Sequence, residues 1–319
     1  MPSTGKRGRK EKQKKHKKEQ KEPTNALAPL HQPRASYDLK KFDPRTMIRP
    51  FSTILFAGGR RTGKSFAMRD FMYHMRKKIY DGDIFSGTFE DDYPWERFLP
   101  PKYVNFVKEK FPNDILNTIL TRQEYRKELA RLHKKKLPPS LLVFEDLEYL
   151  KPSMWNNQEI RYVMFNGRHI NSYVFAAIQY IMEINMALRG MFDGCLFTFE
   201  PSVAVRKRIY DQFGGIFPSF EHFEDVFHEV TKDHRCMFLD MRSGSYNVTE
   251  TVYWYKAEDH GVFRMGVDAI WDDAVDIRNL ERLELERRRA RDNPDLAQPP
   301  PPTTKGKRGR TPVGVNLGD

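Results

Sequence analysis

The sequence predicts an α/β fold in which a mainly parallel β-sheet is flanked by helices. Short apolar runs alternate with helical segments between residues 51 and 231, as expected where crossover helices join parallel strands. The first of these runs ends in a glycine-rich loop, and helical spacing of apolar residues follows at once. Further along, two strand-like runs at 235–241 and 249–255 flank Ser243-Gly244-Ser245, which indicates a C-terminal β-hairpin.

The predicted elements follow from these runs in order. We expect strands over residues 51–57, 83–89, 140–146, 173–178 and 194–199. We expect helices over residues 65–79, 157–168, 183–192, 204–213 and 220–231. Residues 96–139 separate the second strand from the third and are predicted to form a helical insertion, with Ile115, Ile119 and Leu120 on its apolar face.

The two ends of the chain differ from this core in composition. Residues 1–41 are dense in Lys and Arg and poor in apolar side chains, so they are predicted to be disordered until bound. Residues 272–292 predict a charged helix, and the Pro-rich and basic residues 293–319 predict a second disordered tail. The residues between them, 42–271, are predicted to form one domain.

Charge and cysteine content restrict the cellular setting. The chain has 55 Lys and Arg against 43 Asp and Glu, for a net charge of +12. Much of that excess lies in the two ends, and such basic ends are typical of nucleic-acid contacts or nuclear-localisation signals. Two cysteines suit a reducing compartment. The N-terminus has no apolar core of a signal peptide, and no apolar run approaches the ~20 residues of a membrane span. We therefore expect a cytosolic or nuclear protein that is not secreted.

The loop after the first strand fits the phosphate-binding pattern G-x-x-x-x-G-K-[ST]. Its residues are Gly58, Gly59, Arg60, Arg61, Thr62, Gly63, Lys64 and Ser65. Glycines let the backbone curl so that successive N–H groups point at phosphate oxygens, and the helix that starts next adds its positive end. Lys64 can reach the β- and γ-phosphates, and the Ser65 hydroxyl can ligate Mg²⁺. The loop therefore predicts a site for ATP and Mg²⁺.

Two adjacent acids end the apolar run SLLVFED at residues 140–146. A buried strand would carry them to the carboxyl edge of the sheet, where open α/β sheets bind ligands. We predict that Glu145 holds Mg²⁺ through water and that Asp146 is the base for the attacking water. Gln179, which ends the next strand, is predicted to contact the γ-phosphate or that water. The simpler alternative for Glu145 and Asp146 is an acidic turn after a strand, and the simpler alternative for Gln179 is an exposed strand end without a function.

Three segments together resemble a known family. The order GGRRTGKS, LLVFED and FNGRHINSYVFAAIQ resembles the DNA-packaging ATPases of large eukaryotic DNA viruses, which belong to the HerA/FtsK group of P-loop motors. The resemblance covers about residues 48–255. It implies a P-loop NTPase fold in which other strands separate the phosphate-loop strand from the acid-bearing strand. The acid pair, which is commonly Asp then Glu, is reversed in this chain.

The resemblance also implies a biological role. Members of the family assemble into homo-oligomeric rings that drive double-stranded DNA into a capsid, with a capsid or membrane-vertex protein as a further partner. The implied location is the cytoplasmic virus factory or the nucleus of an infected cell, or the virion. Arg168 matches the candidate arginine finger of this family, a side chain that reaches the ATP bound by a neighbouring subunit. The alternative interpretation is that Arg168 is only a cation at a helix C-terminus, where the helix dipole favours positive charge.

Three functions remain open at this point: a ring-forming DNA translocase, a P-loop nucleoside or nucleotide kinase, and a non-enzymatic basic DNA-binding protein. A kinase would need a lid and an acceptor pocket, and the intact Lys64 and acid pair argue against a vestigial loop. The basic run His133–Lys136 is a solvated helix end or a DNA contact. The histidines in 222–234 lack metal-binding spacing and cysteine partners, so zinc is not expected there.

Overall fold

The structure is a computed structural model that describes residues 37–88, 94–150, 153–179, 181 and 184–272. The predicted basic tail before residue 37 lies outside these residues, and so do nearly all of the predicted charged helix and the whole predicted C-terminal tail. Among the described helices, none combines the length and the apolar character that crossing a membrane requires.

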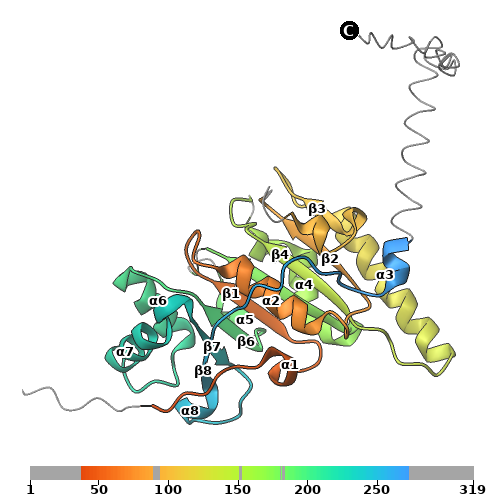
Figure 1. The fold of residues 1–319 in the computed structure, drawn as a ribbon. Coiled ribbons are helices and arrows are strands. Elements are labelled where there is room, and N and C mark those ends of the chain that lie inside the picture. Colours follow the sequence, from red (N-terminus) through yellow and green to blue (C-terminus); the bar gives the residue numbers. More distant parts are fainter. Residues whose placement is uncertain (1–36, 89–93, 151–152, 180, 182–183, 273–319) are drawn as a thin grey trace, which may run out of the picture. The chain divides into compact units, whose positions relative to one another are not determined.

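The described residues form one mixed sheet with the strand order β3-β2-β4-β5-β1-β6-β7-β8 (Figure 1). Neighbouring strands from β3 to β6 run parallel, whereas β7 is antiparallel to both β6 and β8. The mainly parallel sheet and the C-terminal hairpin are thereby confirmed. The strands are β1 (Thr53–Ala57), β2 (Asp81–Ser86), β3 (Val104–Phe106), β4 (Ser140–Glu145), β5 (Ser172–Ile178), β6 (Gly194–Phe197), β7 (Cys236–Asp240) and β8 (Val252–Tyr255).

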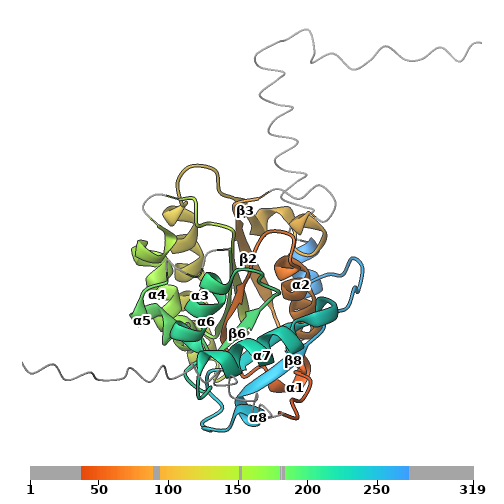
Figure 2. The ribbon, with the colours of Figure 1, turned by 90° about the vertical axis from the view of Figure 1, so that its left-hand side faces the viewer.

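Helices cover both faces of the sheet, with α2 on one side and α3, α4 and α5 on the other (Figure 2). Alternate residues of β1 face the two sides, so Leu55 packs in one core cluster while Ile54 and Phe56 pack in the other. The helices are α1 (Pro44–Met47), α2 (Lys64–Met75), α3 (Asn113–Leu132), α4 (Gln158–Asn166), α5 (Met186–Arg189), α6 (Val203–Phe213), α7 (Phe220–Val230) and α8 (Val248–Thr251). Apolar side chains on both sides explain why β1 and β5 are buried along their whole length.

The register brings three strand ends to one edge of the sheet. Ala57 at the end of β1 pairs with Ile178 of β5, and Glu145 at the end of β4 pairs with Ala177 of β5. The loops that follow β1, β4 and β5 therefore emerge side by side at the carboxyl edge, with β5 in the middle. This order confirms that another strand separates the phosphate-loop strand from the acid-bearing strand.

Three segments differ from the sequence prediction. The strand predicted over 249–255 is limited to Val252–Tyr255, because the residues before it form α8. Residues 96–139 contain α3, but they also supply β3, an edge strand beside β2 that the sequence analysis did not predict. Pro100 caps and Pro101 begins the 3₁₀ turn Pro101–Tyr103, which leads directly into this strand. The helix predicted over 183–192 is limited to Met186–Arg189, because it is capped at one end by the Asn185 side chain and stops at Gly190.

Candidate nucleotide-binding site

The loop between β1 and α2 has the backbone shape that its glycines permit. Gly63 has φ +95° and precedes the first residue of α2, a conformation that strains any other residue. A Cβ at Gly58 would lie 1.8 Å from the Thr198 hydroxyl, so this close approach also requires glycine. Because α2 begins at Lys64, the unpaired N–H groups of its first turn face the end of the loop, where an anion would be stabilised.

Hydrogen bonds hold the loop closed on itself. The Lys64 ammonium donates to the Gly59 carbonyl at 3.1 Å, and the Thr62 hydroxyl donates to the same carbonyl at 2.8 Å. The Thr62 and Thr198 hydroxyls are 2.6 Å apart. Thr198 follows β6 and was not predicted from the sequence, since nothing local marks it. Lys64 is buried, so its charge is concentrated beside the loop rather than in open solvent.

Glu145 lies at the centre of a buried hydrogen-bond network. Its carboxylate accepts from the Ser65 hydroxyl at 2.6 Å through Oε1, and from the Trp95 indole at 2.6 Å and the Ser86 hydroxyl at 3.0 Å through Oε2. Burial raises the pKa of Glu145 to about 6, although the bonds from Ser65 and Trp95 oppose that rise. The structure thus joins Ser65 of the phosphate loop directly to the first acid of the pair. Ser86 and Trp95 were missed by sequence reasoning.

Asp146 leaves the strand in a different direction. Its backbone has φ +49°, and its N–H donates to the Ala177 carbonyl at 3.1 Å. Asp146 and Lys64 line the same cavity, and the buried Oδ1 atom of Asp146 has no hydrogen-bond partner within the described residues. A carboxylate that lines a cavity beside a phosphate loop can bind a water molecule or a metal ion.

Gln179 follows β5 and lies between the other two strand ends. Its Oε1 atom accepts from Arg60 Nε at 3.1 Å, and its backbone N–H donates to the Glu148 carboxylate. The predicted loop, Asp146 and Gln179 therefore share one cavity of about 530 Å³, a size typical of ligand pockets. Four cationic side chains line it, which gives it the charge that a polyphosphate requires: Arg60, Arg61, Lys64 and Arg69.

The donor set also fits Mg²⁺. Magnesium takes oxygen ligands, usually one or two carboxylates or hydroxyls together with water and substrate phosphates. Ser65 Oγ and Glu145 Oε1 lie 2.6 Å apart, and Asp146 lines the adjoining cavity.

Arg168 lies at the other edge of the sheet. It belongs to the 3₁₀ turn Gly167–Ile170, which precedes β5, whereas the phosphate loop follows β1. The seven residues of β5 span about 20 Å between these edges. Arg168 pairs with Asp193 at 2.6 Å, and Asp193 also pairs with Arg242 and accepts from the Thr53 N–H. The structure does not bring Arg168 to the nucleotide cavity of its own chain.

The strand order, the phosphate loop after β1 and the buried acid at the end of β4 give this chain the fold of P-loop NTPases. No protein-family model matches it. An uncharacterized protein of Acanthamoeba polyphaga mimivirus is 29% identical over 227 residues, covering 70% of this chain and 78% of that protein. An uncharacterized protein of Invertebrate iridescent virus 3 is 28% identical over 207 residues, covering 65% of this chain and 76% of that protein.

The chain also has partial matches among solved structures. The genome packaging NTPase B204 from Sulfolobus turreted icosahedral virus 2, in complex with sulfate, has a TM-score of 0.47 at 15% identity and covers 67% of this chain and 100% of that chain. The pCW3 conjugation coupling protein TcpA has a TM-score of 0.43 at 13% identity and covers 65% of this chain and 60% of that chain. A fold alone does not define an activity, so the function of this chain is argued from the residues of its site.

Proposed function

We propose that the chain is an ATPase that moves double-stranded DNA and packages a viral genome into a capsid. The observation that carries the enzymatic part is the hydrogen bond between Ser65 and the buried Glu145, with Asp146 and Gln179 at the same cavity. A phosphate loop, two acids and a polar strand end then surround one ligand, as hydrolysis of a nucleoside triphosphate requires.

Each residue has a proposed role in that reaction. The loop amides and Lys64 bind and orient the β- and γ-phosphates and stabilise the charge that develops on them. Asp146 accepts a proton from the attacking water, and Gln179 orients that water or the γ-phosphate. Ser65 and Glu145 would hold Mg²⁺, which supplies positive charge to the transferring phosphate when it is bound.

Phosphoryl transfer to water is supported by the acid that lines the cavity. The Asp146 carboxylate lies where it can accept a proton from a water molecule in that cavity. A nucleoside kinase would transfer the phosphate to an acceptor, and transfer of label from [γ-³²P]ATP to nucleosides instead of water would identify that alternative.

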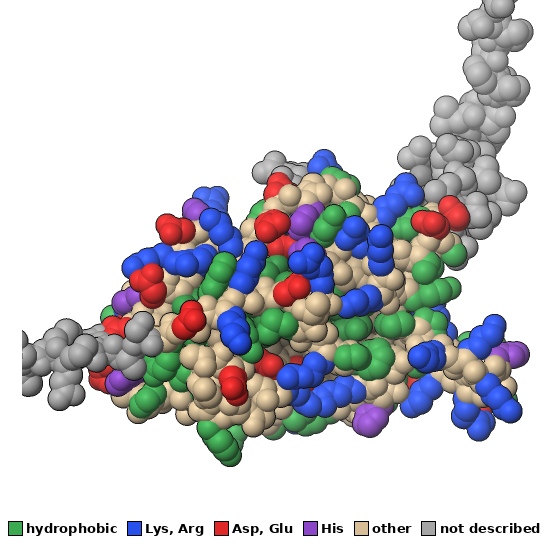
Figure 3. Space-filling model, turned by 60° about the horizontal axis from the view of Figure 1, so that its bottom comes forward, with side chains coloured by type: hydrophobic (Ala, Val, Ile, Leu, Met, Phe, Trp, Pro, Cys, Tyr) green, Lys and Arg blue, Asp and Glu red, His purple; other side chains and the backbone are tan. Residues whose placement is uncertain are grey.

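DNA as the partner is supported by charge and by relatives. The excess of 12 positive charges favours phosphate backbones. The described residues add an exposed basic tip at the end of α3, formed by Arg131, Lys134, Lys135 and Lys136, and Lys and Arg side chains gather at that protruding end in Figure 3. The relatives from viruses and the motif resemblance support packaging, a homo-oligomeric ring, a capsid or membrane-vertex partner, and residence in an infected cell or virion.

The first test compares Lys64→Ala with Lys77→Ala, which changes an exposed lysine just after the same helix. We expect ATP turnover in the presence of double-stranded DNA to fall at least ~10²-fold in Lys64→Ala and to stay unchanged in Lys77→Ala. Unfolding temperatures should match that of the parent chain. Normal turnover in the folded Lys64→Ala chain would refute the ATPase assignment, and turnover unaffected by DNA would refute the translocase.

A further inference from the structure

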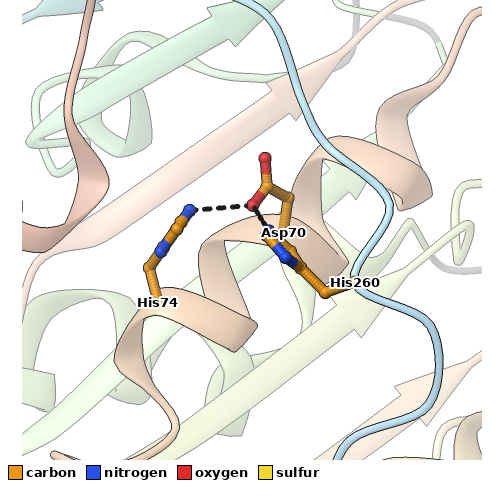
Figure 4. Close-up of side chains that lie close together, drawn as sticks. All are labelled: Asp70, His74 and His260. Carbon is orange, nitrogen blue, oxygen red and sulfur yellow. Dashed lines mark hydrogen bonds and ion pairs between the residues drawn. The ribbon is translucent and has the colours of Figure 1, made fainter.

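A second cluster of ligand-type side chains lies on α2, away from the phosphate loop. Asp70 and His74 lie on adjacent turns of this helix, and His260 comes from the segment after β8, as Figure 4 shows. Both imidazoles point Nε2 at one oxygen of Asp70, at 3.0 Å from His74 and 2.8 Å from His260. The three ligand atoms lie within 4.8 Å of one another.

Contacts with neighbouring residues hold the side chains of this cluster in fixed positions. The second oxygen of Asp70 accepts hydrogen bonds from the Tyr255 hydroxyl and from the Glu258 N–H at 2.9 Å, which fixes the carboxylate. The Tyr73 ring stacks on the His260 ring with centroids 3.7 Å apart and planes 6° apart, which fixes the imidazole. Supporting contacts of this kind orient the ligands of metal sites in proteins.

Charge at the cluster favours a cation. Asp70 is only 3% exposed, and its ion pairs among the described residues are both to histidines. A buried carboxylate whose ion pairs are to imidazoles rather than to Lys or Arg is a favourable environment for a metal cation.

The spacing and the surroundings suit a zinc-sized ion. Tetrahedral ligands at 2.0–2.1 Å from zinc lie about 3.3 Å from one another, so small side-chain shifts would give three of the four positions. A cavity of about 20 Å³ lined by Asp70, His260 and Arg69 lies beside the cluster and has room for one water as a fourth ligand.

We propose that Asp70, His74 and His260 bind one divalent transition-metal ion of the zinc class, which fastens the segment after β8 to the phosphate-loop helix. This site differs in chemistry from the magnesium site, because imidazole nitrogens suit zinc, cobalt and nickel, whereas magnesium takes oxygen. Phe66 and Arg69 of α2 line both the small cavity and the nucleotide cavity, so the ion would stabilise the helix on which Lys64 and Ser65 lie.

The experiment uses the full chain, stripped with a chelator and free of nucleotide and Mg²⁺. We expect isothermal titration to give one Zn²⁺ per chain, and Co²⁺ to give the visible absorption of a four- or five-coordinate ion. Saturating Zn²⁺ should raise the unfolding temperature, since a ligand that binds only the folded state stabilises it.

Three variants test the assignment. His260→Gln can still donate a hydrogen bond to Asp70 but removes a metal ligand, and His74→Gln does the same from the helix. Each should lower Zn²⁺ affinity at least ~10²-fold and abolish the cobalt spectrum, while the exposed His133→Gln should change neither. Equal Zn²⁺ binding by all four chains would overturn the proposal. The proposal would also be overturned if the parent chain binds no Zn²⁺ and shows no cobalt spectrum. The three side chains would then hold the segment after β8 to α2 by hydrogen bonds alone.

Discussion

The carboxyl edge and the amino edge of the sheet carry the same kinds of charged side chain but use them for different purposes. At the carboxyl edge, Asp146 and Lys64 line one cavity of about 530 Å³, and Asp146 Oδ1 has no hydrogen-bond partner among the described residues. At the amino edge, Arg168 pairs directly with Asp193, and Arg49 pairs with Asp240 at 2.8 Å. Charges that are left apart around a cavity can act on a ligand, whereas charges that neutralise each other mainly hold the fold. For this reason we propose the first edge as the nucleotide site.

Arg168 could contradict this distinction, because it lies at the amino edge and is nevertheless proposed to act on ATP. Its substitution is expected to cause the largest loss of ATP hydrolysis. We propose that it acts in trans, because about 20 Å separate it from its own phosphate loop. Its side chain is 44% exposed, and Asp193 would keep Arg242 and the Thr53 N–H if Arg168 turned to a neighbouring chain. Arg168→Ala should bind ATP normally and lose ~10³–10⁵-fold in hydrolysis, while the exposed Arg208→Ala should lose nothing.

A mixture of two inactive proteins distinguishes the finger from a structural role. Arg168→Ala and Lys64→Ala chains that co-assemble would form interfaces with an intact phosphate site on one side and an intact Arg168 on the other. Partial ATPase activity should return at those interfaces. If a mixture shown to co-assemble stays inactive, the in-trans assignment is wrong, and a rate loss that tracks a lower unfolding temperature would mark Arg168 as structural.

At the carboxyl edge, Asp146→Asn is expected to have the next largest effect. Removing the proposed base should lower hydrolysis by ~10²–10⁴-fold while ATP–Mg²⁺ binding stays measurable. The exposed Asp268→Asn serves as the matched control and should hydrolyse ATP at the parent rate. If Asp146→Asn loses nucleotide binding while Glu145→Gln loses only the chemical step, the two acids have the opposite roles.

The contrast between the edges also shows what the sequence could reveal. Gly58–Ser65 and the pair Glu145-Asp146 were recognisable because their chemistry depends on residues adjacent in the chain, and the fold follows from strands and helices of the same local kind. Trp95 was not recognisable, because it reaches Glu145 only through packing between residues 50 positions apart.

The same limit hid the histidine cluster. His260 meets Asp70 across 190 residues, and no local pattern marks either residue as a partner of the other. Arg168 shows the converse: its motif context suggested a nucleotide contact, but only the direction of β5 reveals that it lies at the opposite edge.

The pKa of Glu145 gives a smaller effect that depends on pH. Because burial raises this pKa to about 6, Glu145 is protonated in an increasing fraction of molecules as pH falls below that value. A neutral acid attracts Mg²⁺ less, so the Mg²⁺ concentration for half-maximal binding should rise by up to about tenfold per pH unit below 6. Glu145→Gln should bind Mg²⁺ weakly and with an affinity that does not follow the titration of residue 145. Dividing the Mg²⁺ concentration for half-maximal binding of the parent chain by that of Glu145→Gln therefore removes the effect of nucleotide protonation.

Stability provides a check on the same group without Mg²⁺. A folded pKa of about 6 lies above the ordinary value of 4.5, so Glu145 contributes stability below pH 4.5 that is lost as pH rises through 6. The free energy of unfolding of Glu145→Gln should lack this decrease. Parallel pH profiles for the two chains would mean that the carboxylate titrates normally.

The smallest expected effect is on the salt dependence of DNA binding, and the test again compares variants at the two edges of the sheet. Lys135 and Lys136 lie in the exposed tip of α3 at the amino edge, whereas the exposed Lys108 and Lys110 follow β3 at the carboxyl edge. Phosphate contacts release counterions, so Lys135→Ala/Lys136→Ala should lower the slope of log affinity against log salt by up to ~1.8, without changing sequence preference. Lys108→Ala/Lys110→Ala, which removes the same charge, should leave that slope unchanged. Equal slopes for both double variants in a salt titration with double-stranded DNA would mean that the tip of α3 is a solvated helix end, and DNA would then have to be bound elsewhere on the chain.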